Sequence, residues 1–268
     1  QSVWARFADV DTPFGPIPQV KLIVVEGLPV IRIPAHGWRF PLPGLDDTLA
    51  VFWLLSRLEV EQALVDASVG GIRAKPWDVV VPDDVLVNDH AKLAVTRLGQ
   101  ALGRTPWVRM ADPFCPRLRR VLVSALERYQ TAQTPHHPLG ELMDGGLYVC
   151  TPLSVFETAA EIRLLHAAGA TVVGQSMGQE AAAARVCGIC LAVVNPVANY
   201  AEGLGGGVWI EGGMDRFYEE CALPMGLVAY WALQEAVAQP RDCRCTSVTT
   251  KADVSRFTTE ADRAGEGR

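Results

Sequence analysis

The sequence lacks any run of about 18 apolar residues, the length that a membrane-spanning helix needs. Its first stretch, QSVWARFADVD, has no apolar core of the kind that marks a secretory signal. It also lacks a basic excess, because 24 Lys and Arg stand against 30 Asp and Glu for a net charge of −6. Nucleic acid binding needs positive charge to neutralise phosphates. We therefore expect neither a membrane partner nor a nucleic acid partner.

Paired cysteine motifs are scarce. Seven cysteines, an odd number, are spread along the chain, which suits a reduced, cytoplasmic protein better than a disulfide framework. The single C-x-x-C motif, from Cys187 to Cys190, has no second Cys or His pair at matching spacing. We interpret these two residues as buried structural thiols and place Cys243 and Cys245 in a polar tail. The expected metal content is none.

Short apolar runs rich in Val and Ile alternate with helical patterns. We expect strands at 20–34 (two strands joined at Glu26 and Gly27), 62–72, 78–87, 145–151, 170–175 and 189–200. We expect helices at 46–59, 115–130, 154–169, 178–188 and 214–238, with Asp46 or Asp47 as the first N-cap and a kink at Pro224.

This alternation is typical of an α/β fold with a mixed, mostly parallel twisted sheet flanked by helices. No domain linker interrupts the pattern, so we expect a single domain over residues 1–238 and a polar C-terminal tail over 239–268. The segment 131–146 is polar and contains Pro and Gly, which is typical of a loose connection.

In an open α/β sheet, ligands bind beyond the carboxyl ends of the strands. Small residues and polar side chains follow five of the expected strands, at 34–38, 66–72, 150–161, 172–180 and 197–203. Within the third stretch, Ser154 and Glu157 form the S-x-x-E pattern of a helix capping box. Glu157 is therefore open to two interpretations: it caps a helix, or it holds a ligand.

Five segments, in order, carry a resemblance that covers about residues 9 to 235. They are VDTPFG (10–15), MADPFCP (110–116), FETAAE (156–161), VGQS (173–176) and ANYAEG (198–203). Together they resemble the trimeric purine nucleoside phosphorylase and methylthioadenosine or methylthioinosine phosphorylase family. The resemblance implies a nucleoside phosphorylase-like fold, a homotrimer, a small-molecule substrate and no cofactor, with phosphate as the family's co-substrate. It also implies that the residue near Trp107 reaches a neighbouring subunit's site.

The resemblance implies that Phe156, Glu157 and Asn199 form a pocket for a 6-oxopurine, with Glu157 and Asn199 as the catalytic pair. The chemistry agrees with this assignment. An aromatic face stacks on a purine, and a carboxylate accepts the N1–H of hypoxanthine or guanine. An amide both donates and accepts, so it can serve O6 and N7 together.

The resemblance also implies an altered phosphate and sugar site. The family's Gly-rich phosphate loop would precede the first residue of this chain. The family's Arg-His pair is here Ala35-His36, its Gly-Pro-Arg is Leu153-Ser154-Val155, and an Asn or Thr is Ala67. Fixed cations and amides bind a dianion, and the donors that remain are His36, Ser68 and Ser176. Gln175 replaces the family's Met under the sugar, and Met177 is assigned to the same pocket.

Two functions remain open at this stage. The first is an enzyme acting at the N-glycosidic bond of a purine nucleoside or a 5′-methylthio nucleoside, a pentosyltransferase reaction. The second is a repurposed family member that converts or only binds a different small molecule without phosphate. The loss of several anion ligands favours the second, whereas Phe156, Glu157 and Asn199 favour the first.

Overall fold

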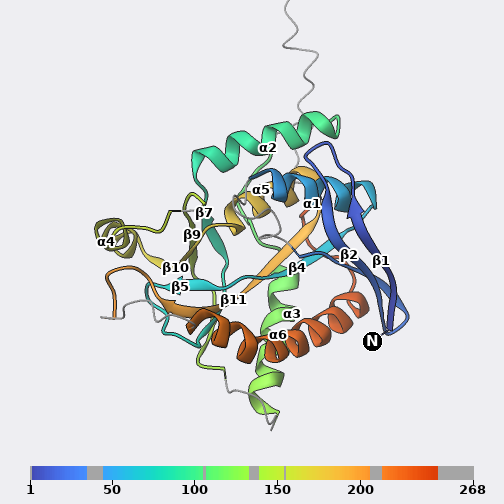
Figure 1. Ribbon diagram of the computed structural model, residues 1–268. Coiled ribbons are helices and arrows are strands. Elements are labelled where there is room, and N and C mark those ends of the chain that lie inside the picture. Colours follow the sequence, from blue (N-terminus) through green and yellow to red (C-terminus); the bar gives the residue numbers. More distant parts are fainter. Residues whose placement is uncertain are drawn as a thin grey trace, which may run out of the picture.

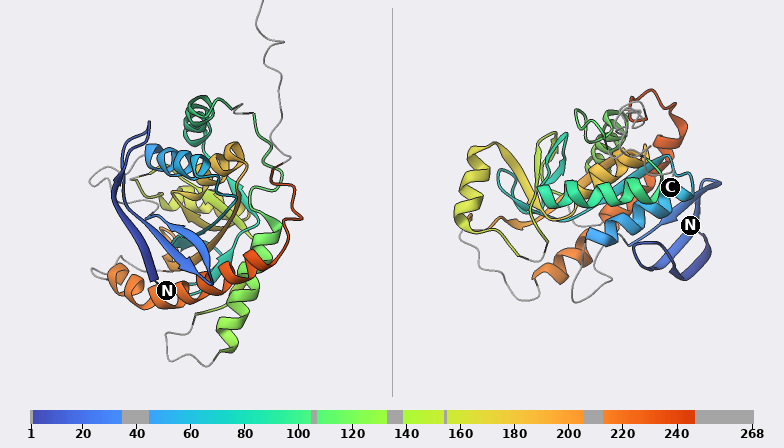
Figure 2. Two further views of the ribbon diagram at one scale, coloured as in Figure 1. Left: turned by 90° about the vertical axis from the view of Figure 1, so that its right-hand side faces the viewer. Right: turned by 90° about the horizontal axis from the view of Figure 1, so that it is seen from above.

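The computed structural model describes residues 2–34, 45–104, 107–132, 139–153, 155–205 and 213–246. The chain begins with a three-stranded antiparallel sheet of β1 (Ser2–Val10), β2 (Ile17–Val25) and β3 (Leu28–Arg32). Glu26 and Gly27 have φ of 49° and 81° and form a two-residue turn between β2 and β3, which confirms the predicted hairpin. This sheet lies beside α1, the first helix (Leu45–Arg57), and β2 also contacts the last helix (Figures 1 and 2).

The second sheet has eight strands in the order β7-β9-β10-β5-β11-β6-β8, with β4 also paired to β11. The strands are β4 (Gln62–Asp66), β5 (Val69–Gly71), β6 (Val79–Val81), β7 (Asp84–Leu86), β8 (Leu142–Asp144), β9 (Leu147–Cys150), β10 (Ala170–Gly174) and β11 (Cys190–Tyr200). Most neighbours run parallel, whereas the pairs β10–β5 and β11–β6 run antiparallel. The predicted mixed, mostly parallel α/β fold is therefore confirmed.

Helices cover both faces of the long central strand β11 (Figure 1). Helices α1, α2 (Asp89–Ala101) and α5 (Met177–Cys187) pack together on one face, and α3 (Pro116–Thr131) and α6 (Gly213–Ala238) pack on the other. Successive residues of β11 pack alternately into two apolar cores, one on each face of the strand. Leu191 and Val193 belong to the first core, and Ala192 and Val194 belong to the second. Helix α4 (Ala159–Ala167) lies apart, beside β10.

Several sequence-based boundaries were wrong. The run 62–72 is two strands, β4 and β5, and the run 78–87 is also two, β6 and β7. Helix α2 was not predicted, although Asn88 caps it by accepting a hydrogen bond from the Ala91 amide, 2.8 Å away. Strand β8 lies in a segment that was expected to be a loose connection. Asp46 and Asp47 lie inside α1 and do not form its N-cap, because the helix already includes Leu45.

Helix α6 is long and contains Pro224, the residue at which a kink was predicted. Among the described residues it is the one helix whose length and apolar composition would suffice to cross a membrane, and 33% of the corresponding window is buried. It makes specific contacts with the protein body. The Arg128 guanidinium lies 4.2 Å from the ring centroid of Trp231, and the rings of Phe217 and Trp77 are 4.9 Å apart. Residues after α6 continue onto the body, where Cys245 is buried.

Candidate functional site

The register of three strands places Asn199, the next-to-last residue of β11, beside β5. Asn199 of β11 pairs with Gly70 of β5, and Gly70 pairs with Val173 of β10. The neighbouring Gly71 has no room for a side chain, since a Cβ there would lie 2.2 Å from the carbonyl oxygen of Ala74. The glycine pair therefore lets β5 fit tightly between the two strands whose ends carry the predicted site residues.

The segment with Phe156 and Glu157 is tied to the carboxyl ends of β9 and β10. Thr151, the first residue after β9, donates its hydroxyl to the carboxylate of Glu157. Its backbone amide donates to the Gly174 carbonyl at 2.9 Å. The Gln175 side chain donates to the Val155 carbonyl at 3.0 Å. These bonds join the two strand ends and the segment before α4 into one unit.

The interpretation of Glu157 as a helix cap is wrong. Helix α4 begins at Ala159, and its capping box is formed by Thr158 and Glu161. The Glu161 amide donates to the Thr158 hydroxyl at 3.2 Å, and the Thr158 amide donates to the Glu161 carboxylate at 2.7 Å. The hydrogen bond from the Thr158 amide lowers the pKa of Glu161. Glu157 thus precedes the N-cap, and Ser154, its expected partner, lies outside the described residues.

The loop that follows Asn199 packs against the start of α4. Gly203 has φ of +76°, and a Cβ on it would lie 2.4 Å from the Cβ of Ala159. The segments FETAAE and ANYAEG are therefore in contact, although they are far apart in the sequence. In this arrangement Phe156 is 59% exposed, and Glu157 and Asn199 are half-buried. The Asn199 amide nitrogen donates to the Tyr200 carbonyl at 2.8 Å.

The remaining predicted residues differ in their surroundings. Ser68 lies between β4 and β5, and its hydroxyl is 2.8 Å from the hydroxyl of Tyr218 on α6. Ser176 is the N-cap residue of α5, and its amide lies 3.5 Å from the Tyr148 hydroxyl. The side chain of Met177 is fully buried in the core. His36 lies outside the described residues.

Three residues near the site were missed by the sequence analysis. Thr151 positions Glu157, and Tyr218 reaches Ser68 from another element. Glu180, in the first turn of α5, is fully buried, and this burial, followed by the charge of Asp66, raises its pKa to about 8. Thr151 and Glu180 had a signal in the sequence, because they lie in the stretches 150–161 and 172–180 at the ends of predicted strands, whereas Tyr218 had none.

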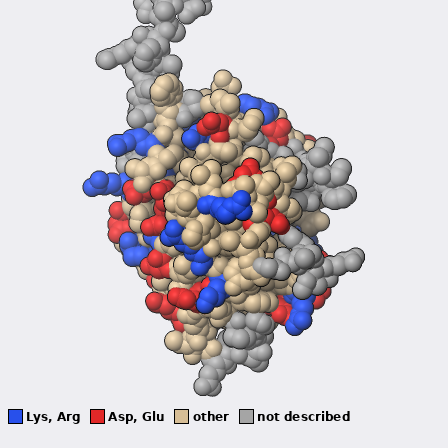
Figure 3. All heavy atoms as spheres, turned by 90° about the vertical axis from the view of Figure 1, so that its left-hand side faces the viewer, with Lys and Arg blue, Asp and Glu red and all other residues tan. Residues whose placement is uncertain are grey.

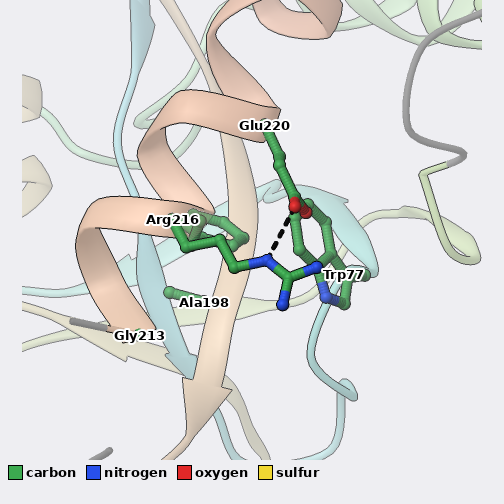
Figure 4. A pocket seen from close by; sticks show the side chains of 6 residues that line it. Trp77, Ala198, Gly213, Arg216 and Glu220 are labelled. Carbon is green, nitrogen blue, oxygen red and sulfur yellow. Dashed lines mark hydrogen bonds and ion pairs between the residues drawn. The ribbon is translucent and has the colours of Figure 1, made fainter. Parts of the chain in front are cut away.

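A pocket of about 290 Å³ is lined by Trp77, Ala198, Gly213, Arg216, Phe217 and Glu220 (Figure 4). At its rim the Arg216 Nε lies 2.7 Å from Glu220 Oε1. Ala198 packs on the α3 and α6 side of β11, whereas its neighbour Val197 packs on the other side. Asn199 directly follows Ala198 on β11 but is not among the residues that line this pocket.

The face of the molecule that carries α4 shows acidic and basic side chains interspersed, with uncharged surface between them (Figure 3). Several large apolar side chains near α4 are exposed, among them Val155 at 73% and Leu164 at 70%. No single sign of charge dominates this face, which differs from the pattern of a polyanion-binding surface.

Comparisons with known proteins agree with the geometry. The sequence model of the phosphorylase superfamily matches residues 5–222. A probable 6-oxopurine nucleoside phosphorylase from Korarchaeum cryptofilum is 33% identical over 215 residues, which cover 76% of each chain. A probable S-methyl-5′-thioinosine phosphorylase from Methanothermobacter thermautotrophicus is 32% identical over 200 residues, covering 73% of this chain and 65% of the relative. The crystal structure of a methylthioadenosine phosphorylase from an antarctic soil metagenomic library shares the fold, with a TM-score of 0.74 at 20% identity, covering 94% of this chain and 87% of that one.

Proposed function

Because this chain belongs to the phosphorylase superfamily, we propose that it cleaves the N-glycosidic bond of a 6-oxopurine nucleoside or of its 5′-methylthio counterpart. The observation that carries the proposal is the placement of Glu157. Its carboxylate accepts a hydrogen bond from Thr151 at the end of β9, and it does not cap α4. A half-buried carboxylate that has a fixed orientation and does not cap a helix is suited to recognise a ligand.

Base recognition follows from the three residues around the strand ends. The exposed ring of Phe156 offers a face on which a purine can stack. Glu157 accepts the N1–H that a 6-oxopurine carries and a 6-aminopurine lacks. The Asn199 amide turns from the Tyr200 carbonyl toward the base, where it donates to N7. This set selects hypoxanthine or guanine over adenine.

Cleavage breaks the bond between C1′ of the sugar and N9 of the base. The bonding electrons pass into the purine ring, and the sugar becomes oxocarbenium-like. The Asn199 donor at N7 stabilises the negative charge that develops on the leaving base. A nucleophile, phosphate or water, then forms the new bond at C1′, and a proton from solvent completes the free base.

The nucleophile is the second part of the proposal. The position that is Arg in the methylthio branch is here Val155, whose side chain is 73% exposed and whose carbonyl already accepts a hydrogen bond from Gln175. Ser68 and Ser176 remain near the strand ends as donors. Without a fixed cation, a phosphate dianion binds only weakly at this position. We infer that turnover depends only weakly on phosphate.

The oligomeric state is proposed to be a homotrimer. Trp107 is 71% exposed and Phe156 is 59% exposed, so both side chains are accessible to a neighbouring subunit. A neighbouring subunit that places Trp107 over Phe156 would close the base site. Sedimentation at micromolar concentration should show one trimeric species, and a monomer alone would contradict this assembly.

Binding of free bases tests the proposed specificity. Hypoxanthine and guanine should raise the melting temperature of the wild-type protein, and adenine should raise it much less, because adenine lacks the N1–H that Glu157 accepts. A ligand at 100 times its dissociation constant stabilises the fold by about 2.7 kcal/mol, which a melting experiment resolves easily. Equal shifts with adenine and hypoxanthine would contradict the role of Glu157. No shift with any purine would favour a repurposed scaffold for another small molecule.

A further inference from the structure

Four cysteines from three parts of the chain meet at one point. The Sγ atoms of Cys115, Cys190, Cys243 and Cys245 all lie within 4.8 Å of one another. The sulfurs of Cys190 and Cys243 are 3.3 Å apart. None of the four forms a disulfide bond in the structure.

The sequence spacing concealed this cluster. The C-x-x-C motif is split, because the Cys187 sulfur lies 3.4 Å from the Phe52 carbonyl whereas Cys190 belongs to the cluster. Cys190 is the first residue of β11, and Cys115 is the N-cap residue of α3. Cys243 and Cys245 follow α6 in a segment that was expected to be a polar tail. The expectation of buried structural thiols holds for Cys187.

We propose that these four cysteines bind one zinc ion as a tetrahedral, all-thiolate structural site. A zinc–sulfur bond of about 2.3 Å requires sulfurs about 3.8 Å apart at the corners of a tetrahedron. The separations in the cluster bracket that value, so closing around a cation needs only small movements. Four sulfur ligands favour zinc over magnesium or calcium, which prefer oxygen ligands.

The surroundings suit the charge of such a site, since zinc with four thiolates carries two net negative charges. An Arg241 nitrogen donates to the Cys190 sulfur at 3.4 Å. Another nitrogen of the same guanidinium pairs with Glu61 at 2.7 Å, which orients Arg241. Cys115 stands at the N-terminus of α3, where the helix dipole favours negative charge. Partners of this kind tune and orient metal ligands.

The burial of these four cysteines is consistent with a structural site that a metal ion can reach from one side. Cys115, Cys190 and Cys245 are at most 2% exposed, whereas Cys243 is half-buried. A structural zinc site has all four positions filled by protein, so it performs no chemistry on a substrate. Its effect here would be to fasten the segment after α6 to the starts of β11 and α3. This role is independent of the proposed nucleoside chemistry.

Metal analysis of the full chain, purified with a mild reductant and without chelator, tests the site. The expected result is about one zinc per chain, and seven thiols that titrate after denaturation with a chelator. Replacing zinc by cobalt should give the intense visible absorption of tetrahedral cobalt thiolate. Metal-free protein that takes up no cobalt would overturn the proposal. A thiol count lowered by two or four would overturn it in favour of disulfide bonds.

A pair of matched variants separates the site from ordinary packing. Cys245→Ser removes one ligand, whereas Cys221→Ser changes a cysteine that is equally buried in the same apolar core but lies outside the cluster. We expect Cys245→Ser to lose zinc and Cys221→Ser to keep it. A strong chelator should lower the melting temperature of wild type and of Cys221→Ser. Equal zinc content in both variants would contradict the assignment, and the wild-type metal content decides the question if Cys245→Ser fails to fold.

Discussion

The hydroxyl of Thr151 donates a hydrogen bond to the carboxylate of Glu157, which joins the end of β9 to the residue immediately before the N-cap of α4. The same Thr151 is fastened through its backbone amide to Gly174 at the end of β10. The sheet therefore orients the Glu157 carboxylate, and α4 begins after Glu157 without using it as a cap. In the proposed function, recognition of the ligand by Glu157 is therefore separate from the capping of α4.

Thr151→Val tests whether Thr151 positions Glu157. The change keeps the shape of the side chain and removes the donor to the carboxylate. Since a hydrogen bond to a charged group contributes about 1.5–3 kcal/mol, we expect kcat/KM to fall about tenfold or more. Thr151→Ser keeps a hydroxyl and should restore most of the activity. Unchanged activity in Thr151→Val would show that this hydrogen bond does not position Glu157.

Glu157→Gln should weaken binding without weakening the fold. The variant loses the carboxylate that accepts the purine N1–H, which we expect to raise the dissociation constant for hypoxanthine about ten- to a hundredfold. The melting temperature should stay close to that of wild type, because Thr158 and Glu161 cap α4. Calorimetric titration and thermal melting measure the two quantities. A large loss of stability with unchanged affinity would return Glu157 to a structural role.

Thr158→Ala should give the opposite result. Removing the N-cap hydroxyl costs about 0.5–2 kcal/mol of unfolding free energy, and the Thr158 side chain contributes nothing to the proposed base contacts. Denaturant unfolding should show the loss, while hypoxanthine affinity changes less than in Glu157→Gln. A variant as stable as wild type would show that the capping box of α4 contributes little.

Glu180→Gln should change how stability depends on pH. The pKa of Glu180 is raised from 4.5 to about 8 by burial and by Asp66, so the folded protein keeps the proton that the unfolded chain loses above pH 4.5. This contribution to stability is complete at low pH and is lost as pH rises toward 8. Gln has no proton to lose, so its advantage over wild type should grow across this interval and then level off. Parallel stability curves from pH 5 to 8 would contradict the raised pKa.

Features that depend on neighbouring residues were predictable from the sequence. The β2–β3 hairpin followed from Glu26 and Gly27, and α3 followed from its amphipathic pattern after Cys115-Pro116. The cap of α4 was ambiguous, because SVFETAAE contains two overlapping capping patterns, one starting at Ser154 and one at Thr158. The structure uses the second, which directs Ile162 into a small apolar core.

Features that depend on contacts between residues far apart in the sequence could not be predicted from local patterns. Nothing in the sequence around Ser68 indicates that Tyr218 of α6 meets it, and nothing around Cys190 indicates the three cysteines that join it. Likewise, Gly203 and Ala159 are neighbours only because β11 and β10 lie on either side of β5. The expectation that Phe156, Glu157 and Asn199 share one site came from the resemblance to a family, because local patterns gave no indication of it.

The proposed activity is tested by release of free base from inosine and from 5′-methylthioinosine, followed by chromatography with and without millimolar phosphate. We expect wild type to release hypoxanthine from at least one of them, with little change in rate on adding phosphate. Asn199→Ala should slow release strongly, because the donor at N7 is gone. A rate that requires phosphate would contradict the inference drawn from Val155. No release of base from either nucleoside under both conditions would contradict the proposed activity itself.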